Sequence, residues 1–131
     1  MWGQMDAFGH VNNTVYFRYF ESARIAYFDA MSMEALMARL KIGPILGETA
    51  CRFRIPLQYP DVVTVGARVA AVDFERGQLQ MHYAVFSRHH GGRAAAVGDG
   101  LIVPFSYADQ QRAPLPDAWL DAIRAIEQDI S

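Results

Sequence analysis

The chain has 131 residues, of which 52% are apolar and 12% aromatic, so it fits one folded domain over residues 1–131 with a sizeable core. Its formal charge of −2 excludes the basic surface of a general nucleic-acid binder. No apolar run approaches the roughly 18 to 20 residues of a membrane span, and the first residues lack signal-peptide character, so we expect a cytoplasmic protein without a membrane span.

The first informative segment is the sequence WGQMDAFGHVNN at residues 2–13. Asp6 lies in a glycine-containing turn ahead of Asn12 and Asn13, and asparagine is a residue type that caps helices. The first turn of a helix has backbone N–H groups without intrahelical partners. The segment can therefore aim a carboxylate and free N–H groups at one small substrate group.

The aromatic-rich run that follows predicts a long helix over residues 14–31, opened by Asn12 or Asn13. Apolar side chains cover most of its helical wheel, which predicts a helix largely enclosed by other structure. Arg24 lies three residues after Glu21, a spacing that favours an intrahelical ion pair.

Residues 33–40 predict a shorter helix, ended by the breaker Gly43-Pro44. The period then changes to two, which predicts half-buried antiparallel strands over residues 48–57, 62–72, 78–88 and 94–107.

Within the second of these strands, the alternation places one set of small apolar side chains on a common face: Val63, Val65, Ala67, Val69 and Ala71. In the last strand, Gly98 and Gly100 suggest a bulge, and Pro104 cannot donate to a ladder. An amphipathic helix over residues 117–129 closes the chain. This order predicts an α+β fold in which one antiparallel sheet wraps around one buried helix.

Cys51 is the only cysteine, which excludes an internal disulfide and a cysteine-based zinc site. It can be a nucleophile or a small buried thiol. Its place in a predicted strand, without a histidine-containing motif related to it, favours the buried thiol.

Three segments carry a resemblance to a known family. The motif at residues 2–13, followed by YFRYFESAR at residues 16–24, resembles the hotdog-fold acyl-CoA thioesterases of the 4-hydroxybenzoyl-CoA thioesterase type. PLQYPD at residues 56–61 is similar to that family's turn between its second and third strands. The resemblance implies a hotdog fold and hydrolysis of an acyl-CoA thioester without a metal or an organic cofactor. It also implies a homo-oligomer, either a dimer or a dimer of dimers (a homotetramer).

The resemblance further implies the roles of two residues. In such enzymes the aspartate at the position of Asp6 is the catalytic carboxylate, acting as nucleophile or as general base on water. The backbone N–H at Asn13, or at a close neighbour, holds the thioester carbonyl. A helix N-terminus carries about half a positive charge, which suits it to a developing oxyanion. Many relatives have a second acidic residue two positions earlier, where this chain has Gln4, which argues against a role for an acidic pair.

Each candidate in this segment also has a structural interpretation. Asp6 can be a turn or capping residue, and His10 can be a proton shuttle or a brace for the loop. Tyr16 can belong to the core or to an acyl pocket. The other candidates for substrate binding in this segment are Gly9, Val11 and Asn12.

Arginines provide candidates for the phosphates of coenzyme A, whose charge requires cationic partners. Arg52 and Arg54 occupy alternate positions of one predicted strand and therefore share a face. Arg88 belongs to a basic cluster around the Gly91-Gly92 turn, which a solvated hairpin tip also explains.

Two other functions share the predicted scaffold. Hotdog-fold hydratases and dehydratases typically have five residues between an aspartate and a histidine, whereas Asp6 and His10 have three residues between them. A non-catalytic acyl-CoA binding module is the second alternative, because a fold alone does not fix a function. The identity of the acyl group, and the choice between coenzyme A and an acyl carrier protein, remain open. We also expect the strand beginning near residue 48 to pair with its copy in another chain.

Overall fold

The structure, a computed structural model, describes residues 13–55, 57 and 62–127. In chain order its elements are α1 (Asn13–Ala30), α2 (Met33–Leu40), β1 (Ile42–Phe53), β2 (Val63–Asp73), β3 (Gln78–Ser87), β4 (Arg93–Ser106), β5 (Gln111–Arg112) and α3 (Asp117–Ile126).

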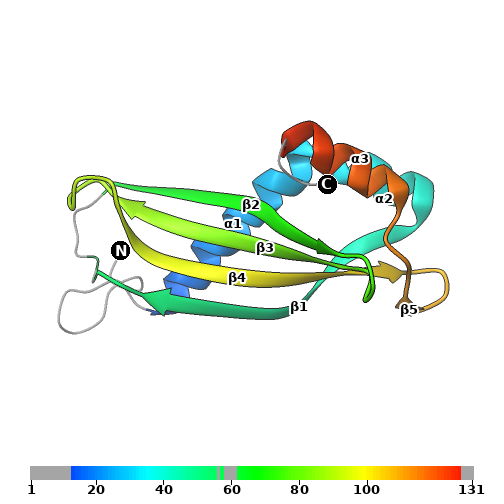
Figure 1. Ribbon diagram of the computed structural model, residues 1–131, viewed down its shortest axis with the longest axis horizontal. Coiled ribbons are helices and arrows are strands. Elements are labelled where there is room, and N and C mark those ends of the chain that lie inside the picture. Colours follow the sequence, from blue (N-terminus) through cyan, green and yellow to red (C-terminus); the bar gives the residue numbers. More distant parts are fainter. Residues whose placement is uncertain (1–12, 56, 58–61, 128–131) are drawn as a thin grey trace.

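The strands form one antiparallel sheet in the order β1-β4-β3-β2, with the short β5 paired to β4. The long helix α1 crosses one face of this sheet and passes behind it in Figure 1. The helices α2 and α3 both lie at the end of the sheet away from the start of α1 (Figure 1). The predicted α+β fold, with one sheet around one long helix, is confirmed.

The first strand begins earlier than expected. It starts at Ile42, so Gly43 and Pro44 lie inside β1 and do not break the chain. Gly43 allows a close approach, because a Cβ atom there would lie 2.7 Å from Cε2 of Tyr107. Pro44 faces Pro104 in the register, so the two residues that cannot donate share one position of the ladder.

The prediction that Gly98 and Gly100 form a bulge is wrong. Both lie in regular register with β1 and β3, and the irregularity of the β3–β4 ladder lies nearer the hairpin, opposite Val85 and Phe86. A Cβ atom at Gly98 would meet the ring of Phe20, and one at Gly100 would meet the ring of Tyr83. These glycines therefore make room for aromatic side chains.

A bulge that the alternation did not predict lies in β2. Val69 pairs with Met81, whereas Ala71 pairs with the adjacent Gln80, so one extra residue separates them. As a result Ala71 is exposed, and Val72 packs against the core at the place predicted for Ala71.

One side of α1 packs on β2 and β3, but the helix is less enclosed than its composition predicts. In the single chain Phe17 is 39% exposed and Ile25 is 52% exposed. Arg24 donates from Nη1 to the hydroxyl oxygen of Tyr83 at 3.1 Å, across the layer between α1 and the sheet, in place of the predicted pairing with Glu21.

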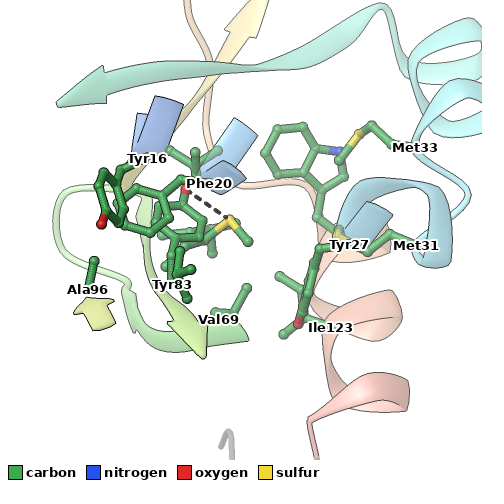
Figure 2. Packing of buried hydrophobic residues seen from close by; sticks show 14 of the residues in the cluster. Tyr16, Phe20, Tyr27, Met31, Met33, Val69, Tyr83, Ala96 and Ile123 are labelled. Carbon is green, nitrogen blue, oxygen red and sulfur yellow. Dashed lines mark hydrogen bonds between the residues drawn. The ribbon is translucent and has the colours of Figure 1, made fainter. Parts of the chain in front are cut away.

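The helix α3 closes the core at the other end of α1. Of the predicted apolar face, Trp119, Leu120 and Ile123 are buried but Ile126 is 37% exposed, and the helix ends at Ile126, before the predicted residue 129. Figure 2 shows Ile123 close to Tyr27 of α1. Just beyond α3, Oε2 of Glu127 accepts hydrogen bonds from the Tyr27 hydroxyl at 2.9 Å and from the Val69 N–H at 3.2 Å. One carboxylate therefore joins α3, α1 and the edge strand β2.

Removing this carboxylate should destabilise the fold. We expect Glu127→Ala to lower the free energy of unfolding by about 1 to 3 kcal/mol, because the buried Tyr27 hydroxyl and Val69 N–H would both lose their acceptor. Urea denaturation followed by circular dichroism measures the change. The matched control is Asp121→Ala, which removes a carboxylate that is 79% exposed and should cost less than about 0.5 kcal/mol. Equal stability of the two variants would show that the hydrogen bonds to Glu127 do not stabilise the fold.

Candidate active site

The start of α1 lies at one end of the sheet. The last residue of β1, the beginning of β2 and the β3–β4 hairpin are at this same end (Figure 1). The helix begins at Asn13, so its first backbone N–H groups, which have no partner within the helix, point toward this end. The geometry brings a helix N-terminus and several strand ends together.

Tyr16, in the first turns of α1, is anchored to the end of β1. Its side chain is 2% exposed, and its ring meets that of Phe53 edge to face, with 4.9 Å between the ring centroids. Burial raises the pKa of Tyr16, with a smaller opposing effect from a hydrogen bond with the backbone of Leu57. The hydroxyl therefore stays protonated, and Tyr16 forms a fixed wall at this end of the core.

One turn further along, Phe20 and Tyr83 continue this wall. Their rings stack with 5.1 Å between centroids and an interplanar angle of 19°, and Figure 2 shows Tyr16 beside them. Arg24 completes the group, since its guanidinium contacts the Tyr83 hydroxyl and lies 5.7 Å from the centre of the Tyr83 ring. Burial raises the pKa of Tyr83, and Arg24 acts in the opposite direction. The result is an aromatic wall with the Arg24 guanidinium against Tyr83.

Sequence reasoning missed the contribution of Arg24 and Tyr83. Arg24 was expected to pair within its own helix, but its partner lies 59 residues away in β3. The signal that could have revealed them is the pair Gly98 and Gly100. Alternate glycines in a central strand mark the face where large side chains approach the backbone.

Cys51 packs against the core on the α1 side of the sheet and is half-buried. Burial raises the pKa of its thiol, which leaves the neutral form dominant and argues against a nucleophilic thiolate. This agrees with the interpretation of Cys51 as a small buried thiol.

The candidate arginines divide between two surfaces. Arg52 and Arg54 line a hollow on the sheet face opposite α1, whereas Phe53 between them points to Tyr16. Arg88 follows β3, in the hairpin at the end where α1 begins, and its N–H donates to the carbonyl of Val62. Of these three arginines, only Arg88 belongs to the hairpin.

Among the predicted site residues, several lie outside the described residues: Asp6, Gly9, His10, Val11 and Asn12. Asn13 is the first residue of α1. Across the described part of the chain, no group of three or more histidine, cysteine or acidic residues could hold a metal ion. Within the same residues, no helix combines the length and apolar character needed to cross a membrane.

Comparison with known proteins identifies the family. The family model of the thioesterase-like superfamily matches residues 1–123. A thioesterase from Thermus thermophilus, solved with coenzyme A and zinc, is 32% identical over 98% of this chain and 89% of that chain, with a TM-score of 0.81. The PA2801 protein of Pseudomonas aeruginosa is 28% identical over 94% of this chain and 92% of that chain, with a TM-score of 0.74.

A more distant structure has the same fold. The DHNA-CoA thioesterase of Staphylococcus aureus is 19% identical over 96% of this chain and 85% of that chain, with a TM-score of 0.77. No curated protein matches the chain. The family model covers the motif at residues 2–13 together with the described sheet and α1, and the expected hotdog-fold thioester hydrolase is confirmed at this level. The chain belongs to the thioesterase-like superfamily.

Proposed function

We propose that this protein is an acyl-CoA thioesterase, which hydrolyses the thioester bond to a free carboxylic acid and coenzyme A. The observation that carries the proposal is the start of α1 at Asn13, the last residue of the motif that contains Asp6, together with the buried wall of Tyr16, Phe20 and Tyr83. The motif offers a carboxylate and free helix N–H groups within a short stretch of chain, and the wall adds an apolar surface from α1 and β3.

In the proposed reaction, Asp6 accepts a proton from water as the water oxygen attacks the thioester carbonyl carbon. The backbone N–H groups at Asn13 and its neighbours stabilise the oxyanion, a contribution that is worth roughly 3 to 4 kcal/mol in enzymes with comparable donors. Collapse of the tetrahedral intermediate breaks the carbon–sulfur bond, and the proton passes to the departing thiolate. His10 is the candidate shuttle for that proton.

The alternative role of Asp6 is nucleophilic. Its carboxylate oxygen would then attack the carbonyl carbon, expel the thiolate and form a mixed anhydride, which water hydrolyses in a second step. Both routes use the same oxyanion donors at Asn13. They differ in the origin of the oxygen atom first added to the acyl group.

Different residues are proposed to bind the thioester end, the acyl group and the coenzyme A phosphates. Gly9, Val11 and Asn12 are proposed to contact the thioester end, and Tyr16 the acyl group. Arg88 is proposed to meet a coenzyme A phosphate, a role that its place between β3 and β4, at the end of the sheet where α1 begins, supports. Arg52 and Arg54 remain candidates for phosphate contact from the opposite face of the sheet.

We further propose that the protein is a homo-oligomer that pairs through β1. This strand is the outer strand of the described sheet on that side, and Ile45, Leu46 and Phe53 are between 38% and 47% exposed along it. An exposed apolar edge favours pairing with a second copy. We expect size-exclusion chromatography with light scattering to give a mass at least twice that of one chain. A monomer at micromolar concentration would contradict this expectation.

A thiol-release assay tests the proposed activity directly. The protein is incubated with aromatic, short-chain and long-chain acyl-CoA esters, and with matched acyl carrier protein thioesters, while free thiol is measured. We expect turnover of at least one acyl-CoA class. Tight binding of these esters without thiol release would overturn the proposal in favour of a binding module, and consumption of an enoyl-CoA without thiol release would favour a hydratase.

A further inference from the structure

The sheet face that α1 leaves uncovered carries a second candidate site. It is a hollow of about 650 Å³, which spans all four long strands. The sheet face that α1 leaves uncovered is turned toward the reader in Figure 1. Its volume falls in the range of small-molecule sites in proteins. The helix α1 and the ring of Phe20 lie on the other side of the sheet, although Tyr83 and Gly98 also line the hollow. The hollow is therefore distinct from the start of α1, but it shares Arg52 and Arg54 with the candidates for contact with coenzyme A phosphates.

The register of the strands explains the hollow. Val97, Ala84 and Gly66 are aligned across β4, β3 and β2, and they form a strip of small residues. The adjacent row consists of Asp99, His82 and Arg68, whose side chains are longer. Phe86, from the next position of β3 on the same face, bounds the other side of the strip. The row of longer side chains on one side and Phe86 on the other therefore enclose an apolar floor.

Charge around this hollow is unbalanced. Among the described residues, three arginines line it, Arg52, Arg54 and Arg68, but Asp99 is the one carboxylate that does so. Asp99 lies 3.9 Å from Nη2 of Arg52 and 3.5 Å from Nε2 of His82. Considering only the residues that the structure describes, Arg54 and Arg68 form no ion pair. The rim thus keeps a surplus of positive charge over an apolar floor.

We propose that this hollow binds a small organic anion with a flat apolar body. The apolar body would lie on the strip of Val97, Ala84 and Gly66, against the exposed edge of Phe86. Arg52 stands on β1, Arg54 directly follows it and Arg68 stands on β2, so the cations flank a floor about 14 Å wide, three strand spacings. A carboxylate or phosphate at one end of such a ligand would therefore meet a guanidinium group.

The charge also argues against a second copy of this face as the occupant. Two copies in contact would bring six arginines together with two aspartates, and like charges disfavour such a contact. A small anion instead relieves the surplus charge. The proposal does not depend on the hydrolytic function, because it uses neither Asp6 nor the start of α1.

Isothermal titration calorimetry with 2-naphthoate tests the proposal, and 2-naphthamide is the uncharged comparison. The titrations are run without and with saturating coenzyme A, because coenzyme A would compete for the hollow if Arg52 and Arg54 held its phosphates. We expect submillimolar binding of 2-naphthoate and at least roughly fivefold weaker binding of 2-naphthamide. Arg68→Gln should weaken 2-naphthoate binding by a similar factor, and Ala84→Leu, which fills the floor, should abolish it. The control Arg39→Gln removes an exposed cation on α2 and should bind like the unmodified protein.

Rates of thiol release distinguish a failure of this proposal from a failure of the proposed function. Arg68→Gln and Ala84→Leu should both leave thiol release unchanged. The proposal is overturned if 2-naphthoate does not bind, or if it binds equally to Arg68→Gln, Ala84→Leu and Arg39→Gln. It is also overturned if either variant in the hollow changes the oligomeric mass and the unmodified protein does not bind 2-naphthoate, since the face would then be a contact between copies.

Discussion

Asp6→Asn is expected to lower kcat/KM for acyl-CoA hydrolysis by about 10³-fold. The amide has nearly the shape of the carboxylate, but it can neither accept the proton of water nor attack a carbonyl carbon. The N–H groups at the start of α1 remain, so binding of the acyl-CoA should change little. The loss should therefore appear in kcat, with KM nearly constant. Steady-state thiol release with the best substrate of the panel measures both constants.

A matched control separates this chemistry from a general effect of losing a carboxylate. Asp29→Asn makes the same change on the exposed side of α1, near its other end, and should leave kcat/KM within about twofold. Thermal unfolding of both variants shows whether each is folded. If Asp6→Asn is folded and keeps more than a third of the original kcat, Asp6 is not the catalytic carboxylate, although the family assignment would stand.

The sheet was largely predictable because its strands alternate apolar and polar residues. The predicted strands at residues 62–72 and 78–88 agree with β2 and β3 to within one residue at each end. The start of β1 was missed because Gly43-Pro44 is typical of a chain break. Pro44 fits inside the strand because it faces Pro104, which also lacks a backbone N–H. This pairing joins residues that are distant in the sequence.

The candidate site was predictable only in part. The motif at residues 2–13 is contiguous, so it can be identified from the sequence alone. The aromatic wall is not contiguous, since it joins Tyr16 and Phe20 of α1 to Tyr83 of β3 through space left by glycines of β4. A glycine in a strand can mark either a bulge or a close approach, and the sequence does not say which side chain crosses above it.

Gly98→Ala is expected to lower the free energy of unfolding by about 2 to 3 kcal/mol, a cost typical of inserting a methyl group into a packed core. A Cβ atom at Gly98 would lie 2.6 Å from the carbonyl oxygen of Ala50 in β1 and would overlap the ring of Phe20. The Phe20 ring can tilt, but the carbonyl belongs to the neighbouring strand of the ladder. Relief therefore requires a shift between β1 and β4. Urea denaturation at matched protein concentration measures the change in stability.

The control for this substitution is another strand glycine. A Cβ atom at Gly66 would meet only Cε2 of Phe86, at an ordinary contact distance of 3.9 Å, so Gly66→Ala should be neutral or stabilise by up to about 1 kcal/mol. The double variant Gly98→Ala with Phe20→Leu should lose less free energy of unfolding than the sum of the two single losses. The smaller side chain at position 20 removes one of the two overlaps. Equal stability of Gly98→Ala and Gly66→Ala would show that the aromatic wall does not need an empty position in β4. The packing that links α1 to the sheet beside the proposed active site would then differ from the one described.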